Sequence, residues 1–430
     1  MNKRLLRTIS FLVIFSIFFS FLNSIMEIPN LRWRVFYKLP KNSLDLLFIG
    51  NSHSFYTYEP LVIDKLLHTN SFNIGLGGEN IVLSYYELRE ILKHQKPKVV
   101  VLETFSLDMT EFPITEPYYF EFFDAGMWDG SKLSVANRYL TPDTMYMVFP
   151  ALRTRISWDD LSPYKQELIN KTSDLFSLLP VNFGRRGATL NTRVIKEDDY
   201  QSILSQPPTE HRISPEVNRV YLEKFFELCE KNDIQLILTT SPMVGEPIHN
   251  ERYAPFDVSG FAETHDIPYI TYDMNNFTHL HFVNVDHVNE FGALIISLEM
   301  AEQLADIMEK DIDQARLSYY QDLIFTDYSL QNEKREVTIS LLQADTDVPL
   351  EYQWSIRNRS IEKDIFTGDW SNDPIFHYRF PENGSYEITV KIRKSPDDFI
   401  LTGLYTVGLW GPLGVDKSCS VLSHDTWRYN

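Results

Sequence analysis

Residues 44–54 read LDLLFIGNSHS, an apolar run that ends in a glycine followed by small polar residues. A short, nearly continuous apolar run of this kind is typical of a strand in a parallel sheet, which is buried on both faces. Gly50-Asn51-Ser52 then predicts a tight turn at the carboxyl end of that strand. Because functional side chains gather at the carboxyl ends of parallel strands, this turn is the first candidate for a site.

Strands and helices alternate after this run. We expect helices at 59–67, 80–94, 215–232 and 289–310, and strands at 72–74, 99–102, 234–238 and 267–270. Asn80 and Asn289 are the expected caps of two of these helices. The alternation predicts a parallel α/β sheet with right-handed crossovers over residues 42–310. Residues 105–214 interrupt it with aromatic, proline-punctuated sequence, which indicates an insert that faces the substrate and contains short helices.

The pattern changes near residue 330. Four segments alternate with period two, namely 337–341, 352–356, 375–380 and 386–392, and Asn383-Gly384 predicts a hairpin turn between the last two. The pattern favours a small β-sandwich over residues 330–430. Strand alternation places most of the aromatic side chains of this tail in its core, although stacking on sugars is the alternative for Tyr352, Trp354, Trp370, Tyr378 and Tyr386.

The first 41 residues differ from the rest. Lys3, Arg4 and Arg7 precede a charge-free apolar run over residues 8–26, which as a helix would extend about 28 Å, enough to cross a bilayer. We expect a single transmembrane anchor with the bulk of the chain outside the cytoplasm, since the basic residues precede the run. A cleaved signal peptide is the alternative, but residues 21–25 offer a poor cleavage site.

Charge and cysteine content exclude several classes of protein. The chain has 430 residues and a net charge of −19, which would repel a phosphate backbone, so we expect no nucleic-acid partner. With 43% hydrophobic and 14% aromatic residues the chain is globular and long enough for two domains. Cys229 and Cys419 are too few for a zinc ribbon or a disulfide scaffold; we expect separate buried thiols, with a disulfide between them as the alternative.

Three loops at predicted strand ends carry residues suited to acyl chemistry. Ser52, on the first turn, is either a nucleophile or a helix cap. The glycine-rich turn at 73–78 is either a plain turn or a source of a backbone N–H, from Gly78, for an oxyanion. His287, beside Asp286, is either a general base oriented by a carboxylate or a structural histidine.

Taken together, these loops resemble the sequence blocks of one family. Gly50-Asn51-Ser52 resembles the Gly-Asp-Ser block of SGNH/GDSL-type esterases and acyltransferases, residues 73–78 (NIGLGG) resemble their Asn-x-Gly-x-x-Gly block, and His287 resembles the histidine of their Asp-x-x-His block. The order along the chain agrees, and the resemblance covers residues 42–310. It implies an SGNH fold, a flavodoxin-like three-layer α/β sheet, with Ser52 as nucleophile, His287 as base, and the N–H groups of Ser52 and Gly78 as oxyanion donors.

Two positions depart from the family pattern. The acidic residue that lies three before the histidine is here Asn284, so Asp286 is the preferred residue to orient His287, with Asn284 as the alternative. The block that supplies a third oxyanion donor, an asparagine, is replaced by Glu103-Thr104. Thr104 could donate from its hydroxyl, and Glu103 could donate only if protonated; otherwise the insert supplies the donor or two donors suffice.

The resemblance is strongest to membrane-anchored bacterial members that modify envelope polymers, similar to the D-alanyl transfer protein of teichoic acids and to alginate O-acetyltransferases. It implies an extracytoplasmic serine esterase or O-acyltransferase at the cell membrane, acting on an envelope or extracellular polysaccharide; a transferase would need a multi-span membrane partner as acyl donor. The alternative is a catalytically weak scaffold in polymer assembly. We expect no cofactor and no metal, since His279 and His281 match no common zinc spacing, and we expect Arg185-Arg186 to lie in a solvated loop.

Overall fold

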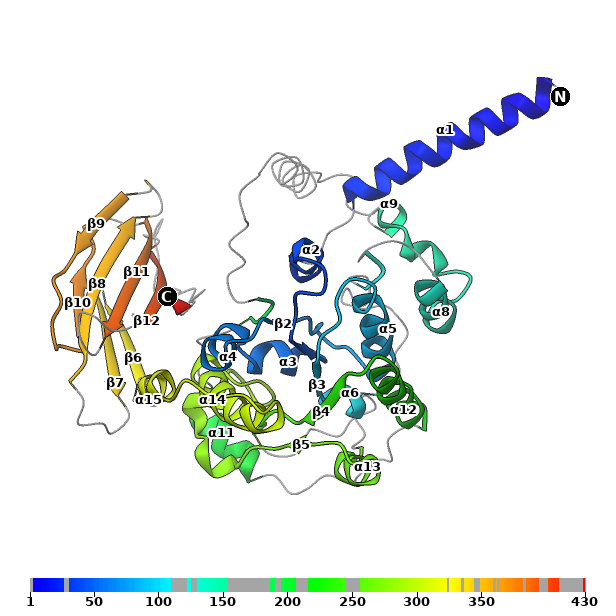
Figure 1. The fold of residues 1–430 in the computed structure, drawn as a ribbon. Coiled ribbons are helices and arrows are strands. Elements are labelled where there is room, and N and C mark those ends of the chain that lie inside the picture. Colours follow the sequence, from blue (N-terminus) through cyan, green and yellow to red (C-terminus); the bar gives the residue numbers. More distant parts are fainter. Residues whose placement is uncertain are drawn as a thin grey trace.

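The computed structural model (Figure 1) describes most of the chain. The described residues are 3–26, 31–109, 122–124, 130–153, 186–189, 195, 197–205, 216–244, 256–322, 325–333, 336–343, 349–358, 361, 363–381, 384–393, 401–409 and 428–429. Their strands form one parallel sheet and two antiparallel sheets. The predicted α/β class is therefore confirmed, and antiparallel strands follow it in the chain as expected.

The parallel sheet has five strands in the order β2-β1-β3-β4-β5. They are β1 (Leu46–Ile49), β2 (Ser71–Asn73), β3 (Val99–Glu103), β4 (Gln235–Thr239) and β5 (Tyr269–Ile270). Every neighbouring pair is parallel. β1 and β3 are interior strands and completely buried, so β1 and the first four residues of β3 are continuous apolar runs, which is why they could be recognised.

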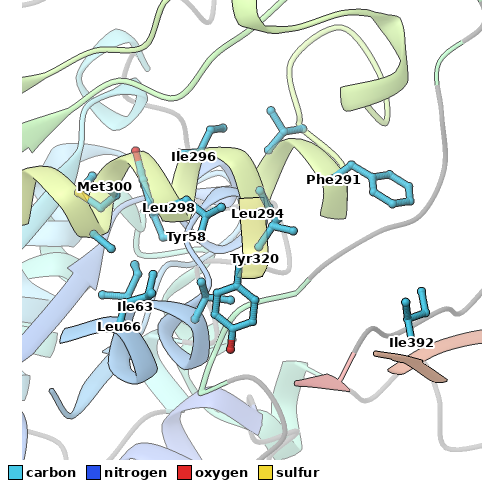
Figure 2. Packing of buried hydrophobic residues seen from close by; sticks show 14 of the residues in the cluster. Tyr58, Ile63, Leu66, Phe291, Leu294, Ile296, Leu298, Met300, Tyr320 and Ile392 are labelled. Carbon is cyan, nitrogen blue, oxygen red and sulfur yellow. The ribbon is translucent and has the colours of Figure 1, made fainter. Parts of the chain in front are cut away.

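Helices cover both faces of this sheet. Side chains of β1 alternate between two cores: Leu46 and Phe48 join one, whereas Leu47 and Ile49 join the other. The first core includes residues of α4 (Pro60–Leu67) and α14 (Glu290–Ile307), and the second includes residues of α5 (Ile81–Ile91), α12 (Glu216–Lys231) and α13 (Val258–His265). In Figure 2, Ile63 and Leu66 of α4 lie beneath α14, which contributes Leu294 and Leu298 to the same cluster.

Two predicted helix caps are present. The Asn80 side chain accepts a hydrogen bond from the backbone of Leu83, and the Asn289 side chain accepts hydrogen bonds from the second and third residues of α14. Both caps satisfy N–H groups that have no partner inside the helix. Helix α14 ends before the predicted residue 310 because Glu309 adopts a left-handed conformation (φ 50°), which the helix cannot continue through.

The described parts of the insert contain short helices. They are α6 (Phe105–Asp108), α8 (Gly130–Tyr139), the 3₁₀ helix η1 (Met145–Val148), α9 (Pro150–Arg153) and α11 (Glu197–Leu204). Residues 186–189, which we call the strap, lie along the free edge of β2. The backbone N–H of Asn73 donates to the carbonyl of Arg186 (2.9 Å), and that of Thr189 donates to the carbonyl of Phe55 (2.8 Å). The strap therefore joins the insert to the sheet edge.

A short helix before the sheet holds the strap from the other side. Helix α2 (Leu31–Lys38) buries Trp33 and Phe36 in the second core. The Arg32 guanidinium donates to the carbonyl of Gly187 (2.7 Å) and lies 4.0 Å from the centroid of the Phe55 ring. The segment that follows α1 (Lys3–Met26) is thus part of the folded body. Among the residues that the structure describes, no helix is long and apolar enough to span a membrane.

The antiparallel strands gather beside the α/β body, and α15 (Gln314–Asp322) leads to them (Figure 1). One sheet has the order β10-β7-β6, and the other has the order β13-β12-β11-β8-β9. Their strands are β6 (Phe325–Glu333), β7 (Glu336–Gln343), β8 (Glu351–Asn358), β9 (Lys363–Thr367), β10 (Ile375–Arg379), β11 (Gly384–Arg393), β12 (Leu401–Leu409) and β13 (Arg428–Tyr429). The rings of Trp354 in β8 and Phe376 in β10 stack 4.8 Å apart and connect the two sheets.

The predicted hairpin at Asn383-Gly384 is wrong. Asn383 lies outside the described residues, but β10 pairs with β7 whereas β11 pairs with β8 and β12, so the two flanking strands belong to different sheets. A longer ladder explains this, because β11 pairs with the whole length of β8. The core assignment of the aromatic residues is confirmed for Tyr352, Trp354 and Tyr386, which are buried.

Candidate active site

Ser52 lies at the first residue of α3 (Ser52–Thr57), directly beyond the carboxyl end of β1. The Asn51 side chain caps this helix by accepting the N–H of His53 (2.9 Å). The turn needs glycine at position 50 for two reasons: its φ is 140°, and a Cβ there would lie 2.9 Å from Cβ of Glu103 on β3. The capping role proposed as the alternative for Ser52 therefore belongs to Asn51.

The structure brings Ser52 and His287 together. Nε2 of His287 lies 2.7 Å from Oγ of Ser52, although the two residues are 235 positions apart. The loop that carries His287 is closed at its base, where Phe282 and Val288 form an isolated β-bridge and the N–H of Val283 donates to the carbonyl of His287 (2.9 Å). The imidazole is thus positioned by backbone hydrogen bonds as well as by the cap at the start of α14.

Both candidate orienting residues lie beside Nδ1 of His287. Oδ1 of Asp286 is 3.0 Å from Nδ1, and Oδ1 of Asn284 is 3.3 Å from it. The same oxygen of Asn284 accepts the backbone N–H groups of Asp286 (3.2 Å) and His287 (2.8 Å), so its main bonds shape the loop. The turn that Asn284 makes brings the adjacent Asp286 side chain round to the imidazole.

The charge of Asp286 is preserved in this position. Burial acts to raise the pKa of its carboxyl, but the hydrogen bond from His287 and the neighbouring imidazoles outweigh burial and leave the pKa below its ordinary value. An ionised carboxylate beside Nδ1 holds the proton on that nitrogen and leaves the lone pair on Nε2 facing Ser52. This is the tautomer that a general base requires.

The glycine-rich turn packs against the serine turn. Asn73 accepts hydrogen bonds from the Ser54 hydroxyl (3.1 Å) and the N–H of Gly75 (3.2 Å), so its side chain joins the end of β2 to α3. A Cβ at position 75 would lie 2.9 Å from the Asn51 carbonyl. Gly78 follows in a left-handed conformation (φ 66°) and is half-buried. The turn therefore lies against the backbone that carries Ser52.

The residues after β3 are engaged in other bonds. The Thr104 hydroxyl lies 2.6 Å from the hydroxyl of Thr240. The Glu103 side chain is completely buried and accepts the N–H groups of Phe105 (3.1 Å) and Ser241 (3.3 Å). Burial raises the pKa of Glu103 to about 8, although these backbone hydrogen bonds act to lower it. Glu103 is therefore protonated at neutral pH and supports the strand ends beneath the site.

Sequence reasoning missed His53 and Tyr56. The ring of His287 is close to both of theirs, with its centroid 4.8 Å from that of His53 and 4.9 Å from that of Tyr56. Burial, and then the neighbouring His287, lower the pKa of His53 to about 3, so its imidazole is neutral. The available signal was spacing: on a helix that starts at Ser52, residues 52 and 56 share a face, and position 53 is adjacent.

Other candidates from the sequence lie elsewhere. His279 and His281 form the 3₁₀ helix η4 (His279–His281), and Nδ1 of His281 accepts the N–H of Thr278 (3.0 Å), so that histidine is a local cap. Arg186 does not lie in a solvated loop as expected: it pairs with Asp64 (3.5 Å) and hydrogen-bonds to Asn70 at the sheet edge. Arg185 and Cys419 lie outside the described residues, and Cys229 is buried and free.

Comparison with known proteins gives no relative from which a role could be transferred. The chain matches no family model, and it matches none of the curated proteins. The function therefore has to be inferred from the geometry around Ser52 and from the resemblance of the three sequence blocks.

Proposed function

We propose that the protein is a serine-dependent acyl esterase or O-acyltransferase that acts on a cell-envelope or extracellular polysaccharide. One observation carries this proposal: Oγ of Ser52 lies 2.7 Å from Nε2 of His287, whose Nδ1 lies 3.0 Å from the carboxylate of Asp286. The proposed nucleophile thus contacts the proposed base, and the base contacts its orienting group, which is the spatial order that serine acyl transfer requires.

In this mechanism Nε2 of His287 accepts the hydroxyl proton of Ser52 as Oγ attacks the ester carbonyl carbon. The tetrahedral intermediate collapses, the carbon–oxygen bond to the alcohol breaks, and His287 returns the proton to the leaving alkoxide. A serine acyl ester remains. Water or a sugar hydroxyl then loses its proton to His287 and attacks this ester, which releases the acid or the acylated sugar and regenerates Ser52. The second acceptor decides between hydrolysis and transfer.

The oxyanion of both intermediates would be held by backbone N–H groups. Ser52 is the first residue of α3, so its own N–H belongs to the unpaired donors of a helix start. Gly78 is the proposed second donor, because its turn packs on the Ser52 turn and glycine lets the backbone approach a ligand closely. Thr104 remains the proposed third donor; its hydroxyl would have to exchange the bond to Thr240 for one to substrate.

The SGNH family assignment is part of the same proposal. The strand order β2-β1-β3-β4-β5 is the order of flavodoxin-like sheets, and the serine and histidine loops lie beyond strand ends, as the resemblance implies. We propose that the two antiparallel sheets form a β-sandwich, on the basis of the Trp354–Phe376 stack between them. The apolar, charge-free run at residues 8–26 supports a membrane anchor with the catalytic body outside the cytoplasm.

The substrate class follows from charge and location. The net charge of −19 of the whole chain favours a neutral or amino-sugar polymer over a polyanion, because like charges repel the substrate at low ionic strength. If the reaction is a transfer, the acyl group must come from a partner, for which a multi-span membrane acyl donor is the proposed candidate.

A fluorophosphonate probe tests the proposal on the full chain in detergent. We expect covalent labelling of the wild type that is lost in Ser52→Ala and in His287→Ala, while the matched control Ser134→Ala, at an exposed serine of α8, labels normally. Absence of wild-type labelling between pH 6 and 9 would instead favour the alternative function, a scaffold in polymer assembly that has lost catalysis.

A further inference from the structure

His53, which the proposed reaction does not use, meets two of its residues, Asp286 and His287, beside Ser52. One donor atom from each of His53, Asp286 and His287 lies within 4.8 Å of the other two. His53 comes from α3, whereas Asp286 and His287 come from the loop before α14. His53 is more than 230 positions from the adjacent pair Asp286 and His287, so its meeting with them follows from the fold.

His53 forms the closed end of this cluster. It is 2% exposed, and its ring stacks on Phe105 with 4.0 Å between centroids. Its Nε2 is buried without a hydrogen-bond partner among the described residues. Packing alone does not explain that atom, because a buried polar nitrogen without a partner costs free energy that an apolar side chain of the same shape would avoid. The unsatisfied nitrogen therefore indicates a ligand.

The chemistry of the set indicates which ligand. Two imidazoles and one carboxylate are a common ligand set for zinc, which takes a fourth ligand from water or a hydroxyl. Hard cations such as magnesium and calcium prefer oxygen ligands and are disfavoured by two imidazoles. Tetrahedral zinc needs ligand atoms about 3.4 Å apart, so the separation of up to 4.8 Å has to shrink by up to about 1.4 Å. Asp286 is 38% exposed and lies on a loop, so this side can approach the fixed His53.

We propose that His53, Asp286 and His287 bind a zinc ion, and that the zinc-bound form is an inactive state of the Ser52 site. A neutral imidazole has a single lone pair. When His287 gives that lone pair to the metal, it cannot accept the proton of Ser52, so the metal and the serine hydroxyl compete for the same base. Metal binding itself is independent of the proposed function, whereas the inhibition depends on it.

Zinc binding to the full chain in detergent, after removal of metal with EDTA and dialysis, tests the site directly. A chromophoric chelator competes for zinc and gives the affinity. We expect the wild type to bind one zinc ion with micromolar or tighter Kd, and His53→Gln and Asp286→Asn each to weaken binding at least 10-fold. Two control variants show whether any loss of binding is specific to the cluster. Ser52→Ala should retain zinc binding, and His279→Gln, at a histidine outside the cluster, should bind zinc like the wild type.

Fluorophosphonate labelling of the same samples tests the inactive state. Free zinc at 10 times Kd leaves about one eleventh of the protein metal-free, so the labelling rate should fall about 10-fold and recover when EDTA is added. Wild-type binding that is unaffected by both cluster variants, or no binding at all, would refute the site. Cluster-dependent zinc binding in a protein that never labels would keep the metal site and reject the enzyme; normal labelling at saturating zinc would reject the inhibition.

Discussion

Asp286 and Asn284 both touch Nδ1 of His287, and replacing each by alanine separates charge from loop shape. Protonation of His287 during attack creates an imidazolium about 4 Å from the carboxylate centre, an attraction of about 4 kcal/mol at an effective dielectric constant of 20. Because the Asp286 side chain is 38% exposed, water screens roughly half of this attraction. The remaining ~2 kcal/mol predicts labelling about 30-fold slower in Asp286→Ala.

Asn284→Ala should be milder. The neutral amide gives no charge to the imidazolium, and its loss removes two backbone hydrogen bonds that shape the loop. If loosening the loop raises the activation free energy of labelling by ~1 kcal/mol, labelling should be about five-fold slower. The assay is the pseudo-first-order rate of fluorophosphonate labelling of the EDTA-treated full chain, with the melting temperature of each variant as the folding control.

A double variant sharpens the comparison. Asn284→Asp in the Asp286→Ala background places a carboxylate on the atom that already lies 3.3 Å from Nδ1, and it should restore labelling to within about three-fold of the wild type. If folded Asn284→Ala were labelled more slowly than folded Asp286→Ala, the charge of Asp286 would not be what supports the base. The same conclusion would follow if the double variant recovered nothing, since a carboxylate acting on Nδ1 would then have no effect on the base.

Three further predictions concern the surroundings of the site. Gly75→Ala places a Cβ 2.9 Å from the backbone under Ser52, so labelling should slow about 10-fold or more while the protein still melts cooperatively; normal labelling would show that the glycine turn does not position the serine. Glu103 is a raised-pKa acid (about 8 against an ordinary 4.5), so it stabilises the fold at low pH and that stability is lost as pH rises toward 8. Between pH 5 and 8 the free energy of unfolding should therefore fall less steeply in Glu103→Gln than in the wild type, by up to ~1.4 kcal/mol per pH unit. Thermal melts whose stability changes equally with pH in both proteins would contradict this. Leu66→Ala removes a completely buried side chain and should cost about 2–5 kcal/mol in urea unfolding with labelling unchanged at low temperature; slower labelling would mean that this core also sets the site geometry.

The parallel sheet was predictable because strands that are buried on both faces have mostly apolar sequences. β1 is a continuous apolar run and so is β3 up to its last residue, and Asn80 and Asn289 mark helix starts by the hydrogen bonds that their side chains accept. The antiparallel strands were predicted in part, since period two reveals a strand but not its partner. Pairing between β8 and β11 links residues 28 to 42 positions apart, and a local turn signal such as Asn383-Gly384 cannot compete with it.

Ser52 and His287 were predictable as a pair because each follows or precedes a recognisable element. The sequence places His53 next to Ser52 but does not show that its ring stacks on Phe105, so its part in the site was missed. The choice between Asn284 and Asp286 also needed coordinates: adjacent side chains usually diverge, and only the turn closed by Asn284 brings Asp286 to Nδ1. Spacing rules do not represent such turns.

The strap has a consequence for how such a protein can change. Its residues 186–189 are tied to Phe55 on the helix that carries Ser52, and α6, where the insert leaves the sheet, begins directly after β3. Both ends of the intervening segment are therefore held beside the reacting serine by bonds that belong to the scaffold. Under the proposed function, substitutions between those two fixed points would change which polymer is accepted while Ser52 and His287 keep their contact.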